Sequence, residues 1–167
     1  MYKFNPMKGS IGMYNKCFSN LHNGYYNRKS RPDGLQDYGP IPIVLNMEDI
    51  TKQNTNFRTA LWTGDYLQLT LMSIPVASEI GLEVHHYTDQ FLCVEEGEGL
   101  VMMGANDNNL DFQVNVYKDY AFIVPAGTWH NIYNTGNYPL KLYSIYAPPA
   151  HPHGTIHETP DDSQHYD

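Results

Sequence analysis

Short runs of β-type residues, separated by turn residues about every eight to twelve positions, fill this sequence from residue 57 onward. In the run 66–74, Leu67, Leu69 and Leu71 alternate with other residues, which is the period of a strand. A clear helical signal stands only at 46–52, where an Asn N-cap is followed by two acidic residues. These patterns predict an all-β fold that closes as a double sheet and carries one short helix.

We expect about nine strands in this part of the chain, joined as a meander. Their ranges are 57–62, 66–74, 81–86, 90–95, 100–103, 112–116, 120–124, 131–134 and 140–146. Polar turns at 105–109 and 135–139 separate neighbouring runs, and no internal repeat is visible.

Composition divides the chain into three parts. Residues 1–36 form an irregular N-terminal arm, residues 37–158 carry the β signals, and residues 159–167 form a polar C-terminal tail that we expect to be frayed. The arm holds too many aromatic residues for a freely solvated linker, so we expect part of it to pack on the barrel or on a partner. These aromatic residues are Tyr14, Phe18, Tyr25 and Tyr26.

Charge is distributed unevenly along the chain, whose formal net charge is −8. Residues 1–40 carry six Lys or Arg against two Asp, whereas residues 41–167 carry four against sixteen acidic residues. An acidic body argues against nucleic acid as a partner, since phosphate binding requires clustered cations. No run approaches the roughly 18 apolar residues of a membrane span, and the N-terminus does not resemble a signal peptide. We therefore expect a cytoplasmic protein with no membrane partner.

Two short segments carry the groups most suited to metal binding. Pro125 and Gly127 form a turn between two β-type runs, and His130 begins the second run. Glu83 and His85 are two residues apart, so in a strand they project from one face with Cα atoms about 6.5 Å apart. Gln90 opens the next run and can point into the same cavity.

The spacing of these residues resembles the two motifs of the cupin superfamily. The likeness covers roughly residues 40–158 and is greatest to small single-domain bacterial cupins of the mannose-6-phosphate isomerase-like group. It implies a double-stranded β-helix, the jelly-roll cupin barrel, over residues 37–158. Glu83 stands where the motif usually has His, Gln90 where it has Glu, and Asp119 where it has Gly. The two motifs read Glu83-x-His85-x4-Gln90-x6-Gly97 and Asp119-x5-Pro125-x-Gly127-x2-His130-x3-Asn134.

A second register of the first motif takes His86 as a ligand in place of His85. That register leaves Val84 at the first ligand position, whereas the register of Glu83 and His85 fills every position with a coordinating group. We prefer the latter, in which His86 points the other way.

The resulting candidate metal ligands are Glu83, His85, Gln90 and His130. Two imidazoles, a carboxylate and an amide oxygen suit a divalent transition metal such as Fe, Mn, Ni or Zn. The structural alternative for His130 is a hydrogen-bonded core residue. The alternative for Gln90 is a side chain that contacts a metal ligand and not the metal itself. For Glu83, burial without a cation or a charged partner would be costly, which favours the ligand.

Other polar and aromatic residues are candidates for the mouth of the barrel, each with an ordinary packing alternative. They are Arg58, Trp129, Lys141, Tyr143 and Tyr146, of which Arg58 or Lys141 can receive an anionic substrate. The histidines at 151, 153 and 157 follow a proline-rich stretch, which predicts an extended strap with exposed rings. We expect solvated or locally bonded histidines there, with a second metal site as the alternative.

Two classes of function fit this sequence. The first is a metal-dependent enzyme acting on a small polar or carbohydrate-like metabolite, either as an isomerase or epimerase with Glu83 as a possible base, or as an Fe-dependent dioxygenase. The second is a non-catalytic metal- or ligand-binding cupin with a structural or assembly role through its Tyr- and Asn-rich arm. In either class we expect a homodimer.

Overall fold

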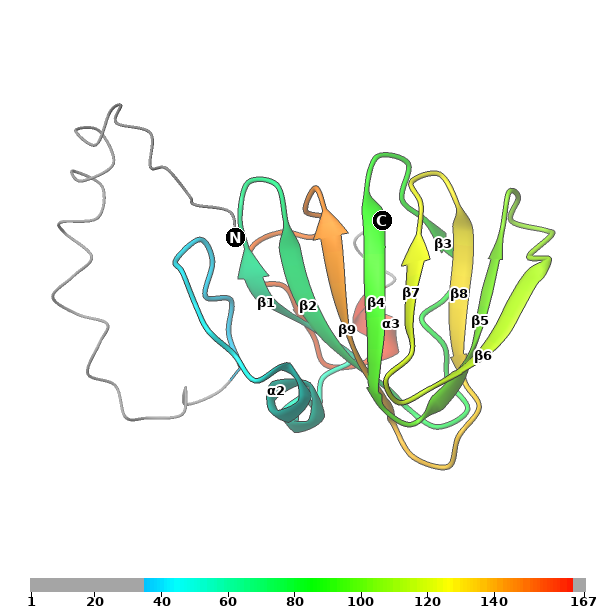
Figure 1. The fold of residues 1–167 in the computed structure, drawn as a ribbon, viewed down its shortest axis with the longest axis horizontal. Helices are drawn as coiled ribbons and strands as arrows, with labels where there is room; N and C mark the ends of the chain where they lie inside the picture. The colour runs from blue at the N-terminus through cyan, green and yellow to red at the C-terminus, as the bar shows by residue number, and fades with distance from the viewer. Residues whose placement is uncertain (1–34, 164–167) are drawn as a thin grey trace, which may run out of the picture. The chain divides into compact units, whose positions relative to one another are not determined.

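Two antiparallel sheets make up the computed structural model, which describes residues 35–163 (Figure 1). The six-stranded sheet has the order β10-β1-β2-β9-β4-β7. Its strands are β1 (Arg58–Thr63), β2 (Gln68–Ile74), β4 (Asp89–Glu96), β7 (Ala121–Val124), β9 (Leu140–Ala147) and β10 (Ile156–His157). The four-stranded sheet has the order β3-β8-β5-β6, with β3 (Glu83–Val84), β5 (Glu98–Gly104), β6 (Phe112–Tyr117) and β8 (Trp129–Asn134). The predicted all-β double sheet is confirmed.

The interior between the sheets changes from apolar to polar along the strands. Buried side chains from both sheets, among them Met72 on β2 and Ile132 on β8, form one hydrophobic cluster. Further along the six-stranded sheet, the buried Tyr146 pairs with Gln68 on one side and with Gln90 on the other. One end of the barrel is therefore packed with aliphatic groups, and the other end is lined by groups that can bond a ligand.

Helix α2 (Met47–Gln53) begins where the sequence predicts it. The Asn46 side chain accepts a hydrogen bond from the Asp49 amide at 3.3 Å, as an N-cap does. A second helix, α3 (Pro160–Ser163), was not predicted. It lies in the tail that we expected to be frayed, and Thr159 stabilises its start by donating from its amide to Asp162 Oδ2 at 2.8 Å.

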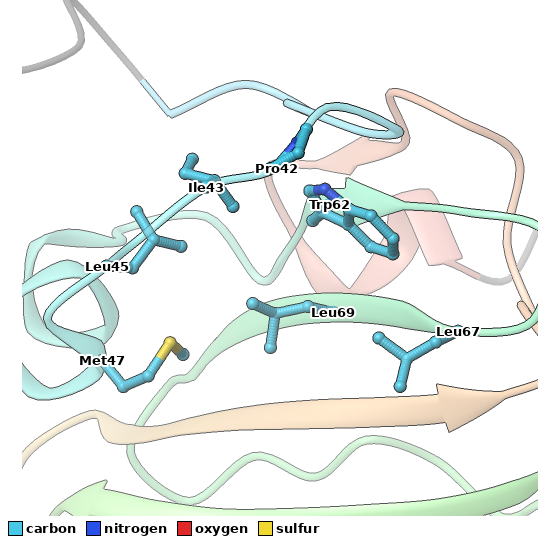
Figure 2. A pocket seen from close by; sticks show the side chains of 7 residues that line it. All are labelled: Pro42, Ile43, Leu45, Met47, Trp62, Leu67 and Leu69. Atoms are coloured by element: carbon cyan, nitrogen blue, oxygen red, sulfur yellow. The ribbon is translucent and has the colours of Figure 1, made fainter. Parts of the chain in front are cut away.

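Two of the three alternating leucines of the sequence line a groove outside the barrel interior. Leu67 and Leu69 line an apolar groove of about 450 Å³ on the outer face of the six-stranded sheet (Figure 2). Trp62 of β1 and the segment that leads into α2 form the rest of the groove, through Pro42, Ile43, Leu45 and Met47. Inward positions on β2 belong instead to the alternate set that includes Gln68 and Met72.

The predicted arm falls outside the described residues, except for positions 35 and 36, and so do its four aromatic residues. Within residues 35–163, no helix is long and apolar enough to cross a membrane.

Asn134, the last residue of the second motif, joins three segments at the apolar end of the barrel. Its buried Nδ2 donates to the carbonyls of Ile74, Pro75 and Tyr138 at 2.8 to 3.1 Å. Its Oδ1 accepts from the Gly136 amide at 2.9 Å. The residue therefore stabilises the fold by satisfying buried backbone groups.

We expect Asn134→Ala to lower the free energy of unfolding by about 1 to 3 kcal/mol, because the buried carbonyls would lose their donor. Urea denaturation measures this change. Asn137→Ala is the matched control in the same turn, and since Asn137 is exposed its effect should stay below about 0.5 kcal/mol. Equal effects of the two substitutions would contradict the assigned role.

Candidate metal centre

The pairing of β3 with β8 places Glu83 directly opposite His130. Side chains that face each other across an antiparallel pair have Cβ atoms about 5 Å apart, so both can reach one point. Although the sequence predicts a strand over 81–86, only Glu83 and Val84 pair, and the chain then turns away. His85 consequently lies in the loop just beyond the strand.

Two hydrogen bonds fix this loop against the turn that precedes β8. The Gly127 amide donates to the His85 carbonyl at 2.8 Å, and the Ala126 amide donates to Asp89 Oδ1 at 2.9 Å. Gly127 has a φ of +79°, a conformation that glycine adopts without strain. The two segments singled out in the sequence thus meet, and the rings of His85 and His130 lie 5.5 Å apart.

Three ligand atoms converge at this point. Glu83 Oε1 lies 3.4 Å from His85 Nε2 and 3.3 Å from His130 Nε2, and all three atoms lie within 4.8 Å of one another. Each is buried and has no hydrogen-bond partner among the residues described. With ligand bonds of about 2.1 Å, neighbouring ligand atoms lie about 3.0 Å apart in an octahedron and about 3.4 Å apart in a tetrahedron. The observed separations fit a single ion held by Glu83, His85 and His130.

A second contact defines how His130 faces this point. Its Nδ1 lies 3.0 Å from the carbonyl oxygen of Thr128, which can only accept, so Nδ1 carries the proton. In the neutral ring, Nε2 then presents a lone pair toward the carboxylate of Glu83. The carboxylate and this nitrogen attract each other through a shared cation or through a proton on Nε2. Metal-bound histidines are commonly oriented through their other ring nitrogen in this way.

Arg58 lies behind the carboxylate. Its Nη2 is 3.9 Å from Glu83 Oε2, and its side chain is only 4% exposed. Burial alone would raise the pKa of Glu83, but the contacts with His130 and His85 and the positive charge of Arg58 outweigh it and hold that pKa well below its usual range. Glu83 is therefore an anion, with one oxygen toward the histidines and the other toward Arg58.

Gln90 and His86 differ in their surroundings. Gln90 is buried on β4, where its Nε2 donates to Ser144 Oγ at 2.9 Å. Its Oε1 is buried and finds no partner in the described part of the chain, so it is free to bind a ligand, and its role at the metal stays a prediction. His86 is exposed and packs against Tyr87, away from the three converging atoms.

The candidate residues for the mouth of the barrel face different sides of the sheet, because alternate residues of a strand point in opposite directions. Tyr146 faces inward, with its ring edge-on to His85 at 5.5 Å. Tyr143 and Lys141 are odd-numbered on the same strand and face outward, where Lys141 donates to a backbone carbonyl at the end of α2. Trp129 is next to His130 on β8 and points to the opposite face. For these three residues the packing alternative holds.

His151 lies close to the centre, although the sequence predicted an exposed ring. The Gln68 side chain clamps its backbone, because Oε1 accepts from the His151 amide at 2.9 Å and Nε2 donates to the His151 carbonyl at 2.8 Å. The His151 ring contacts Tyr146 at 5.1 Å. Since the clamp joins residues 83 positions apart, no local signal in the sequence could have indicated it. Of the other two histidines, His153 is exposed beside Asp37 as predicted, whereas His157 is buried in β10.

Burial lowers the pKa of His151 to about 3 from its ordinary value of 6.5, so the ring is neutral at physiological pH. Other groups packed around it modify this effect and belong to several elements. They are Arg58 on β1, Glu83 on β3, His85 in the following loop and His157 on β10. Tyr146 on β9 contacts the ring as well.

Comparison with known proteins identifies the same fold and site region. A family model described as Cupin domain matches residues 70–146. Uncharacterized protein YrkC of Bacillus subtilis (strain 168) is 58% identical over 146 residues, which span 86% of this chain and 78% of the relative. Uncharacterized protein L612 of Acanthamoeba polyphaga mimivirus is 36% identical and spans 68% of this chain and 69% of the relative. The crystal structure of BH2720 from Bacillus halodurans is 64% identical, with a TM-score of 0.77 over 78% of this chain and 98% of that chain.

The lowered pKa of His151 predicts an acid-sensitive fold. Below pH 6.5 the unfolded chain binds a proton at this position and the folded chain does not, so stability falls as the pH drops from 6.5 toward about 3. We expect His151→Gln to flatten this part of the profile of unfolding free energy against pH. His153→Gln, two positions along the same strap, is the matched control, and an equal flattening by both variants would disprove the assignment.

Proposed function

The chain belongs to the cupin superfamily, and from this premise we propose that it is a metal-dependent enzyme acting on a small polar metabolite. Glu83, His85 and His130 hold a single divalent transition metal in this proposal. The observation that carries it is the convergence of three buried ligand atoms that have no hydrogen-bond partner among the described residues. A buried polar atom without a partner is rare in proteins, and three at one point call for a common ligand.

The reaction that the donor set favours is an Fe(II)-dependent dioxygenation. Two histidines and one carboxylate on one side of a metal, with other positions open, are the ligands of non-haem iron oxygenases. A bound Fe(II) ion supplies redox chemistry with O2 and coordination sites for substrate. The chain's own residues would hold these ligands in place, because the Thr128 carbonyl fixes the orientation of His130 and Arg58 faces the second oxygen of Glu83.

Isomerase or epimerase chemistry has less support from these contacts. It requires a base that is free to take a proton from the substrate. Glu83 was the candidate base, and its Oε1 is directed between the two imidazoles instead. Gln90 remains the proposed fourth ligand, because its buried Oε1 is uncommitted within residues 35–163. The assembly role of the arm rests on residues outside the described part of the chain.

Metal content tests the ligand assignment. We expect purified protein reconstituted with Fe(II) or Zn(II) to hold about one ion per chain, and His85→Ala to lower metal affinity by at least about tenfold, since even the loss of a group that only orients a ligand costs that much. His86→Ala is the neighbouring control and should retain the metal. Elemental analysis after desalting gives the occupancy. Near-zero occupancy of the wild type, or loss in His86→Ala alone, would refute the assignment.

Oxygen consumption tests the reaction. Anaerobic reconstitution with Fe(II), followed by addition of O2 and a panel of small polar metabolites, should give substrate-dependent O2 uptake at an oxygen electrode. Glu83→Ala should abolish this uptake, because the carboxylate completes the ligand set. Deuterium incorporation into sugars from heavy water without O2 uptake would show that the protein is an isomerase instead.

A further inference from the structure

We propose that Arg58 and His151 form a subsite for the carboxylate group of the substrate, beside the candidate metal centre. This inference rests on the proposed function and adds the chemical class of the substrate, a small organic acid. It also gives a ligand to buried polar atoms that do not belong to the three candidate metal ligands.

Arg58 has hydrogen-bonding capacity that its neighbours do not satisfy. Its Nε is buried and has no partner among the residues that the structure describes. Its Nη2 contact with Glu83 is 3.9 Å, too long for a hydrogen bond. A buried guanidinium with a free N–H is costly, and a carboxylate is the group that matches its geometry best.

His151 supplies the second group. The Gln68 clamp holds its backbone on both sides, so the position of the ring is fixed by the fold. Its Nε2 is buried and lacks a partner in the described region. As a neutral ring, it can donate from Nε2 to a carboxylate oxygen in one tautomer.

Tyr146 connects this subsite to the metal centre. Its ring lies edge-on between His85 at 5.5 Å and His151 at 5.1 Å. Its hydroxyl is buried beside the side chains of Ser144 and Thr70. Arg58 Nε and His151 Nε2 offer two donors without partners among the described residues, which match the two acceptor oxygens of a carboxylate.

The charges of the site favour the same class. Arg58 and Glu83 offset each other, so a bound divalent ion would leave the centre with excess positive charge. An anionic substrate removes that excess, and its carboxylate can lie against Arg58 while an adjacent oxygen faces the metal ligands. Arg58 was one of two cations in the acidic body that the sequence suggested for this role, and Lys141 faces the other side of the sheet.

Calorimetric titration tests the subsite, with pyruvate as the carboxylate probe and dihydroxyacetone as the neutral probe of similar size. We expect the Zn(II)-loaded wild type to bind pyruvate at least about tenfold more tightly than dihydroxyacetone, as one charge-assisted hydrogen bond would produce. His151→Gln and Arg58→Lys should each weaken pyruvate binding by about tenfold. His153→Gln, the exposed control, should bind like the wild type, and thermal melts check that every variant is folded.

Three outcomes would each overturn the subsite. The first is an unchanged pyruvate affinity in folded His151→Gln, and the second is equal affinity for the two probes. The third is tighter binding of inorganic phosphate than of pyruvate. Metal content is measured separately, so a failure of the proposed function is recognised on its own. The titration is repeated on metal-free protein, where the selectivity should persist at lower affinity and again depend on His151. Absence of pyruvate binding in both forms would also overturn the proposal.

Discussion

The cross-strand pair of Glu83 and His130 is the contact on which the candidate centre depends. It brings a carboxylate and an imidazole together inside the barrel. The bond from the Gly127 amide to the His85 carbonyl then adds the third group. The first contact joins strands β3 and β8, and the second ties the loop of His85 to the turn before β8, so folding brings the three groups together. Such order lowers the entropy that ion binding would otherwise cost.

Sequence reasoning reached the fold and the three converging residues because their signals are local. Strand periodicity, turn residues and the spacing of Glu83, His85 and His130 are all legible within short windows. Asp119 is a further example: it occupies the usual glycine position of the motif, and its φ of +71° is one that Asp tolerates better than most residues. A likeness to the cupin motifs then joined windows that lie about 45 residues apart.

What sequence reasoning missed depends on contacts between distant residues. The clamp that holds the backbone of His151 requires Gln68, and nothing in the sequence indicates that these two residues meet. Lys141 and Tyr143 were candidates for the mouth, yet their outward direction follows from the inward position of Tyr146 on the same strand. The alternation of side chains along β9 could have shown which residues face inward, but only once one residue of the strand was known to face the centre. Burial of a polar side chain is set by tertiary packing, and composition does not reveal it.

The strand that carries Glu83 has two residues and, among the strands of residues 35–163, lies at the edge of the four-stranded sheet beside β8. His130, in contrast, belongs to a strand bonded on both sides. Short edge elements open at a much lower free energy than the globular unit as a whole. Detachment of β3 would remove one ligand and loosen His85 while the barrel stays folded. In the proposed metal centre, a bound ion could therefore leave through this local opening. The time for which the ion stays bound would then depend on the stability of the edge strand β3.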